Sequence, residues 1–231
     1  EDLTLKVVLD PILNLESSIE AIINDKYNDN IGRQARLMAL GLAIFLNNTS
    51  RGRLKHLNGS DLNRKFWKTA NDIGRTREES GWSWFENAPC KYVTGRMLAL
   101  IGRLRRLGFA IEKECFALLG PEENIKKELS TKLSYLDYRH LQRFHNTSSE
   151  AAPLKALLTP QTIQYSYGRS YFFKDEPLFD GRPKACRNFV KALKGEWPNR
   201  TLMTKAIIAL VLSRLNEKEE ATRIANHLKS L

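Results

Sequence analysis

The chain has 231 residues, of which 42% are hydrophobic and 27% are charged. This length and composition are typical of a globular fold with one large core or two small ones, and no run reaches the ~18 consecutive apolar residues that a membrane span requires. The 37 lysines and arginines outnumber the 26 acidic residues and give a formal net charge of +11, which favours an anionic partner such as nucleic acid, a lipid headgroup or an acidic glycan.

The first residues predict a strand and then a turn between two helices. Residues 3–8 (LTLKVV) alternate apolar and polar side chains before Pro11, which is typical of a short strand. Apolar residues then recur at helical spacing, and the polar residues 24–30 predict a turn. A helix is predicted from Gly32 to Asn47, buried on all sides because apolar residues cover nearly its whole circumference.

Caps, prolines and apolar periodicity predict helices through the rest of the chain. Ser60 or Asp61 caps the next helix, Gly108 closes another, and Asn216 forms a tight turn between the last two. The predicted helices cover residues 60–73, 92–107, 122–145, 160–173, 183–197, 202–215 and 217–230, with a short helix at Leu154 after a polar linker over 147–153.

Helices that are apolar on all sides alternate with amphipathic ones along the chain. A closed ring of helical hairpins needs this alternation, because an inner helix contacts its neighbours and the centre, whereas an outer helix covers only one side. The sequence therefore predicts an all-α fold, an α/α toroid, in one domain over residues 11–231, preceded by the strand within residues 1–10.

The charged residues and the cysteines do not form a recognisable nucleic-acid-binding or metal-binding motif. The basic residues fall in small groups over several helices, which favours a solvated surface, with nucleic-acid binding as an alternative that salt-dependent affinity would test. Cys90, Cys115 and Cys186 lie far apart, without a Cys-x-x-Cys pair or a histidine at ligand spacing. We expect three buried thiols and no metal or other cofactor; one disulfide with a leftover thiol is the alternative.

Two blocks of sequence carry a family resemblance. The first is GWSWF at 81–85, followed by YVT at 92–94 and a helix that ends LRRLG at 104–108. The second is QYSYGRSYF at 164–172, followed by Trp197 and MTKA at 203–206. Both blocks, in this order, resemble the bacterial alpha-2-macroglobulins, especially those of the Bacteroidetes type. The resemblance implies the thioester domain of that family, an α/α toroid, with residues 1–10 as the end of a preceding β domain or a linker strand.

The same resemblance assigns a meaning to the turn at residues 27–34. Family members that trap proteases covalently have Tyr-Pro-Tyr-Gly-Cys-x-Glu-Gln here, and the cysteine thiol condenses with the glutamine into an internal thioester. This chain has Tyr-Asn-Asp-Asn-Ile-Gly-Arg-Gln, so Ile31 stands at the cysteine, Gly32 at the variable position, Arg33 at the glutamate and Gln34 at the glutamine. Isoleucine has no atom that can be acylated, so the motif is degenerate and cannot form the bond.

The remaining candidate residues have simpler structural interpretations. Without a partner thiol, Gln34 is a polar residue in the first turn of a helix. Trp82, Trp84 and Phe85 form an aromatic cluster that we interpret as core, with a ligand-stacking platform as the alternative. The four histidines are expected at the surface, and none lies beside a nucleophilic serine motif; they are His56, His140, His145 and His227.

An enzyme is the alternative function, since α/α toroids also house polysaccharide lyases. No Asp-rich acid motif occurs, and the dense candidates are Tyr165, Tyr167, Arg169 and Tyr171. At helical spacing Tyr167 and Tyr171 share one face, which favours a packed seam over a catalytic group. Lyase activity on uronic-acid polymers, lost on Tyr167→Phe, would support the enzyme.

The resemblance implies a non-catalytic domain that contributes to protease inhibition. The intact protein would entrap or block proteases at the cell envelope, and this domain would act through surface contacts without a covalent thioester. Its expected partners are proteases, other domains of the same polypeptide and an anionic lipid or glycan surface. The chain begins at Glu1 without a leader, so we expect a mature product or an excised domain of an exported bacterial protein, in the periplasm or at the cell surface and membrane-anchored through other parts.

Overall fold

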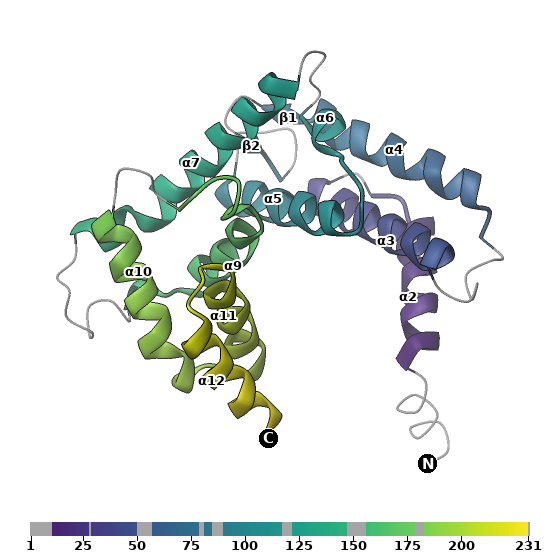
Figure 1. The fold of residues 1–231 in the computed structure, drawn as a ribbon. Coiled ribbons are helices and arrows are strands. Elements are labelled where there is room, and N and C mark those ends of the chain that lie inside the picture. The colour runs from purple at the N-terminus through teal and green to yellow at the C-terminus, as the bar shows by residue number, and fades with distance from the viewer. Residues whose placement is uncertain are drawn as a thin grey trace. The chain divides into compact units, whose positions relative to one another are not determined.

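Figure 1 shows a chain built of successive helices, as predicted from its apolar periodicity. The computed structural model describes residues 11–27, 29–49, 57–78, 81–84, 90–116, 122–146, 156–178 and 183–230. The strand predicted within residues 1–10, the whole linker at 147–153 and the helix predicted at Leu154 lie outside the described residues. The described part falls into two compact units, which comprise residues 1–89 with 103–121 and residues 90–102 with 122–231.

Unit 1 contains α2 (Pro11–Asn24), α3 (Asn30–Thr49), α4 (Gly59–Arg75) and the short α6 (Glu112–Cys115). Helix α3 packs against α2 and α4, and α6 packs against α4. Every residue of α3 from 30 to 47 is buried or half-buried, which confirms the predicted burial on all sides. Helix α4 instead buries one face, through Leu62, Phe66 and Ile73, as its period of 3.6 requires.

The start of α4 corrects one predicted cap. The helix begins two residues earlier than expected, because the Asn58 side chain accepts a hydrogen bond from the Ser60 backbone nitrogen at 3.0 Å. Ser60 and Asp61 therefore lie inside the first turn. The predicted C-cap at Gly108 is confirmed. Gly108 has φ +90°, and Phe109 donates its N–H to the Leu104 carbonyl at 2.9 Å, as expected when a left-handed residue ends a helix.

A two-stranded ribbon follows α4, in a region where the sequence predicted only an aromatic cluster. Strand β1 (Arg77–Glu78) pairs antiparallel with β2 (Gly81–Trp82), with Arg77 opposite Trp82. Gly81 adopts φ 145°, a conformation that residues with a Cβ rarely take. This ribbon fixes the position of the Trp82 side chain in unit 1.

Unit 2 contains the first part of α5 (Lys91–Arg106) and the later helices. They are α7 (Glu122–Asn146), α9 (Pro160–Arg169), α10 (Pro183–Glu196), α11 (Leu202–Arg214) and α12 (Lys218–Lys229), with 3₁₀ turns η1 (Ser170–Phe172) and η2 (Trp197–Asn199). Helix α10 packs on α7, and α11 packs on α12 and α9. Asn216, with φ 67°, forms the predicted tight turn between α11 and α12.

The all-α class is confirmed, and the predicted helix bounds hold to within a few residues. None of the helices in the described part of the chain combines the length and the apolar content that crossing a bilayer requires. All three cysteines are free thiols; Cys115 is buried, and Cys90 and Cys186 are half-buried rather than fully enclosed. The closed toroid and the single domain over residues 11–231 stay predictions.

Candidate functional site

The turn at residues 27–34 in unit 1, which the resemblance compares with the thioester motif, is built by short-range hydrogen bonds at the start of α3. The Asp29 side chain accepts the Gly32 backbone N–H at 2.9 Å, and the Asp29 carbonyl accepts the Arg33 N–H at 3.1 Å. These bonds satisfy donors that the first turn of a helix leaves without an intrahelical acceptor. An aspartate cap therefore sets where the motif residues begin to follow the helix.

Asn30 connects this turn to the segment that follows β2. Its side-chain nitrogen donates to the Ser83 carbonyl at 2.8 Å, and its backbone nitrogen donates to the Trp84 carbonyl at 3.3 Å. Its side-chain oxygen accepts from the Thr76 hydroxyl at 2.8 Å. Asn30 is only 2% exposed, so these bonds form away from water, where a missing partner would be costly. The motif turn and the GWSW segment are thus held together, although 53 residues separate Asn30 from Ser83.

The four residues that the resemblance compares with the thioester motif, residues 31–34, are all buried or half-buried. Ile31 and Arg33 are half-buried, whereas Gly32 and Gln34 are buried, with Gln34 3% exposed. Gly32 lies against the Tyr27 ring so closely that a Cβ there would approach the Tyr27 Cδ1 to 2.2 Å. The turn is therefore a close-packed element, with the half-buried aliphatic side chain of Ile31 in the first turn of α3.

Cys115, the cysteine of unit 1, has a poorly reactive thiol. It lies in α6 and is fully buried, and burial raises the pKa of its thiol well above the ordinary value, helped by Glu114 and Glu112. The thiolate is the reactive form in acyl chemistry, so a thiol that holds its proton is a weak nucleophile.

The aromatic cluster divides into a buried and an exposed residue. Trp82 is 0% exposed, its ring centroid lies 5.7 Å from that of Phe116, and its indole nitrogen donates to the Ile73 carbonyl at 3.3 Å. Trp84, by contrast, is 46% exposed, although its backbone carbonyl accepts the Asn30 N–H. The interpretation as core thus fits Trp82 and not Trp84, and Phe85 lies outside the described residues.

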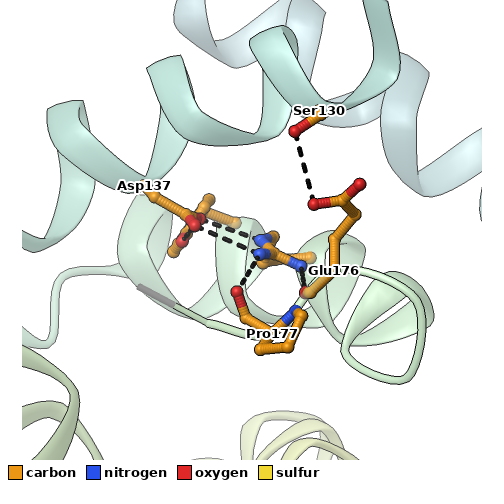
Figure 2. Close-up of polar contacts among 6 residues, drawn as sticks. Ser130, Asp137, Glu176 and Pro177 are labelled. Atoms are coloured by element: carbon orange, nitrogen blue, oxygen red, sulfur yellow. Dashed lines mark hydrogen bonds and ion pairs between the residues drawn. The ribbon is translucent and has the colours of Figure 1, made fainter. Parts of the chain in front are cut away.

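Unit 2 holds a buried polar network around Asp137, a residue that the sequence analysis did not single out. The Arg169 guanidinium donates to both carboxylate oxygens of Asp137, at 2.9 and 3.2 Å, and to the carbonyls of Glu176 and Pro177, at 2.8 and 3.1 Å (Figure 2). The Tyr165 hydroxyl also donates to Asp137, and burial raises the pKa of that phenol well above its usual range. Arg169 and Tyr165, two candidates for an enzyme site, are therefore bound to a structural carboxylate.

Tyr167 and Tyr171 form the packed seam that their spacing predicted. Their hydroxyls are 2.7 Å apart, and their rings meet edge to face with centroids separated by 5.4 Å. The Arg214 guanidinium lies 4.1 Å from the Tyr171 ring centroid, an arrangement typical of a cation–π contact, and it donates to the Ser170 hydroxyl at 2.6 Å. The seam links η1 to α11.

Two of the histidines differ from the expected surface placement. His140 is half-buried, and its ring stacks on that of Tyr165 with centroids 4.4 Å apart. Burial, then the charges of Lys91 and Arg139, lowers the pKa of His140 to about 4. His227 is also half-buried, with its Nε2 3.1 Å from the Lys205 Nζ. His145 is exposed as predicted, and His56 lies outside the described residues.

The lowered pKa of His140 predicts an acid-dependent loss of stability. In the unfolded chain this imidazole takes up a proton near pH 6.5, whereas in the folded chain it does so only near pH 4. The unfolded state therefore binds more protons between these values, and the free energy of unfolding should fall as pH drops from 6.5 towards 4. His140→Gln should flatten this dependence in urea unfolding measured from pH 7 to 5. His145→Gln, in an exposed position of the same helix, should leave it unchanged.

The residues that the sequence analysis missed are polar side chains on buried faces. Asp137 lies four positions after Leu133 and next to Leu136, within the apolar stripe of α7. A charge in such a stripe indicates a buried partner, although periodicity does not say which residue it is. Asn30 carried no comparable indication, because a polar residue in a turn is ordinary.

Comparisons of this chain with protein-family models, curated proteins and solved structures found no match.

Proposed function

We propose that this chain is a non-catalytic, thioester-like domain of an exported bacterial alpha-2-macroglobulin-like protein. In this role it contributes to protease entrapment at the cell envelope through surface contacts, without forming a covalent link to the protease. The proposal starts from the two sequence blocks that resemble this family, and the packing of the motif turn adds to it.

One observation carries the proposal. The turn at residues 27–34 and the GWSW segment at 81–84, which the resemblance treats as parts of one pattern, are joined by the hydrogen bonds of buried Asn30. A turn that is close-packed and anchored in this way keeps its shape whether or not it holds a reactive group. With Ile31 in the cysteine position, the element can serve structure but not acyl transfer.

The packing of unit 2 supports a non-catalytic role over an enzyme. A catalytic base or acid must reach a substrate, but Tyr165 and Arg169 are each 4% exposed and bound to Asp137. Tyr167 and Tyr171 bond to one another. All four side chains that the enzyme alternative requires thus have structural partners.

Helix α11 offers a surface for contact with another domain of the same polypeptide. Leu202, Met203 and Leu210 are 57%, 75% and 44% exposed, and half-buried Ile207 lies between the last two at helical spacing. Apolar side chains grouped on one exposed face favour an interaction surface. The formal charge of +11 also suits contact with an anionic lipid or glycan surface.

Methylamine treatment tests the absence of thioester chemistry. The native chain should release no new thiol and show no mass change at Gln34, because Ile31 cannot hold an acyl group. Peptide mass spectrometry and thiol titration before and after treatment measure both quantities. A thiol that appears only after methylamine would contradict the proposal.

A matched variant tests whether the turn has the geometry of the family. Ile31→Cys combined with Arg33→Glu restores the cysteine and the glutamate of the family motif, while residues 28–30 keep their present identities. Its thiol should condense with the Gln34 side chain, forming a C–S bond and releasing ammonia, and methylamine should then free the thiol again. If the variant keeps its helical circular dichroism but never loses ammonia, the assignment of this turn to the family motif is wrong.

The protease function is tested on the intact protein that contains this domain. After incubation with a broad-specificity protease, cleavage of a large protein substrate should be inhibited more strongly than cleavage of a small peptide substrate. Denaturing electrophoresis should show no covalent adduct between the protease and this domain. Equal cleavage of both substrates with and without the protein would contradict the proposed entrapment.

A further inference from the structure

An open groove in unit 2 is lined by side chains that the proposed function does not use. It lies between one face of α10 and the turn that joins α11 to α12. Helix α10 contributes Arg187, Val190, Lys191 and Lys194, and the turn contributes Leu215 and Glu217. The groove has a volume of about 530 Å³, within the range of about 300–1,000 Å³ that ligand sites occupy. It therefore has room for a ligand much larger than a few water molecules.

The charges of this groove favour an acidic ligand. Arg187, Lys191 and Lys194 stand at positions i, i+4 and i+7 of α10, so they follow one face of the helix. At the rise of about 1.5 Å per residue in a helix, these three positions span roughly 10 Å. Glu217, the one acidic residue among the described lining residues, pairs with Lys194 at 2.5 Å. A ligand with several separated negative charges therefore matches the groove better than a single small anion does.

The uncharged lining residues narrow the class of ligand. Val190 and Leu215 are both half-buried and give the groove an aliphatic surface beside its cations. An aliphatic side chain placed against them would be removed from water. None of the described lining residues is aromatic, so the bases of a nucleic acid would find no ring on which to stack. An aliphatic surface beside a row of cations suits a peptide in which acidic residues flank an aliphatic one.

We propose that this groove binds an acidic peptide segment of a partner protein, in which carboxylates flank an aliphatic side chain. Arg187 and Lys191 pair with the carboxylates, and the aliphatic side chain packs on Val190 and Leu215. Binding is non-covalent and involves no reaction. It goes beyond the proposed function and does not depend on it, since the groove residues lie in unit 2 and the motif turn lies in unit 1.

The ion pair between Lys194 and Glu217 provides a test with the opposite sign. The two side chains are 40% and 37% exposed, so a ligand can reach both. The Glu217 carboxylate competes with a bound acidic peptide for the Lys194 ammonium. Glu217→Gln should therefore strengthen peptide binding about two- to fivefold, the effect of gaining one exposed ion pair. A substitution that only disturbed the groove would weaken binding instead.

The binding experiment uses acetyl-Glu-Glu-Leu-Glu-Glu-amide as the probe. Calorimetry should detect this peptide at millimolar concentration. A peptide with serine in place of leucine should bind about tenfold more weakly, because it lacks the aliphatic side chain. A peptide with glutamine in place of every glutamate should show no binding, because it has no charge to pair with the cations.

Paired variants test the contribution of the groove cations. Arg187→Gln combined with Lys191→Gln should weaken binding about tenfold, because two exposed ion pairs are lost. Lys126→Gln combined with Lys127→Gln removes the same charge from an exposed part of α7. This control should leave binding within about twofold, since exposed charges outside the groove are screened by salt.

Cys186 reports where the peptide binds. Its thiol is free and half-buried and lines the groove, whereas Cys90 is free and half-buried outside it. Bound peptide should slow the alkylation of Cys186 by N-ethylmaleimide several-fold and leave that of Cys90 unchanged, which peptide mass spectrometry measures in one sample. Burial raises the pKa of the Cys186 thiol, so the rates are compared at mildly alkaline pH, where more of the reactive thiolate is present.

Several outcomes would overturn the proposal. These are no binding of the leucine peptide at millimolar concentration, equal binding of the serine peptide, or binding that leaves the Cys186 alkylation rate unchanged. Equal binding of an oligothymidylate with the same number of charges, or equal weakening by the two double variants, would show general attraction to anions instead of this groove. Each variant is first checked for an unchanged thermal unfolding midpoint. The comparison of leucine and serine peptides uses the unchanged chain, so it decides the matter even where a variant fails to fold.

Discussion

Asp137→Ala is expected to lower the free energy of unfolding of unit 2 by about 3–5 kcal/mol, the usual loss when one partner of a buried ion pair is removed. The side chains of Asp137 and Arg169 are only 6% and 3% exposed. Without the carboxylate, the guanidinium remains buried with two backbone carbonyls as acceptors, and the Tyr165 hydroxyl loses its acceptor. Urea unfolding followed by far-UV circular dichroism measures the effect.

Two comparison variants separate this mechanism from the general loss of a surface charge. Asp61→Ala removes a carboxylate that pairs with Arg64 and Lys65 near the surface, and should destabilise much less than Asp137→Ala. Adding Arg169→Met to Asp137→Ala removes the uncompensated charge and should recover part of the stability. Equal free energies of unfolding for Asp137→Ala and the double variant would contradict the role of the uncompensated charge. Equal losses for Asp137→Ala and Asp61→Ala would show that the buried network does not stabilise the fold as proposed.

The helices of this fold could be predicted from sequence because their determinants are local. Apolar periodicity located them, and capping residues such as Gly108 set their ends. The error at the start of α4 arose where several capping residues stand close together, since Asn58, Ser60 and Asp61 can all cap a helix. Only the observed bond from the Ser60 nitrogen to the Asn58 side chain distinguishes them.

The site was less predictable because its contacts join distant residues. Arg169 and Tyr165 were identified as polar candidates, but their shared partner Asp137 lies 32 and 28 residues earlier. The bonds of Asn30 to Ser83 and Trp84 likewise depend on the β1–β2 ribbon. Each strand of this ribbon has only two residues, which is too short to show an alternating pattern in the sequence. The sequence thus singled out Arg169 and Tyr165 but not Asp137 or Asn30, and only the tertiary fold shows what each of them contacts.

The two tryptophans of the GWSW segment differ in burial, so their substitutions should differ in cost. Trp82→Ala is expected to lower the free energy of unfolding of unit 1 by about 3–5 kcal/mol, because a fully buried indole leaves a cavity when it is removed. The variant also loses the ring contact with Phe116 and the hydrogen bond to the Ile73 carbonyl. Urea unfolding by far-UV circular dichroism, which does not depend on tryptophan emission, measures this loss.

Trp84→Ala is the matched control, because it makes the same substitution two residues later. The Trp84 ring is 46% exposed, so less apolar surface returns to water, and its backbone carbonyl, which accepts from Asn30, is retained in the variant. The cost should be below about 1.5 kcal/mol, since the side chain is largely accessible to water and the bond to Asn30 uses the backbone, which the substitution does not change. Equal destabilisation by the two substitutions would mean that both tryptophans act as one buried cluster and that the ribbon does not separate them.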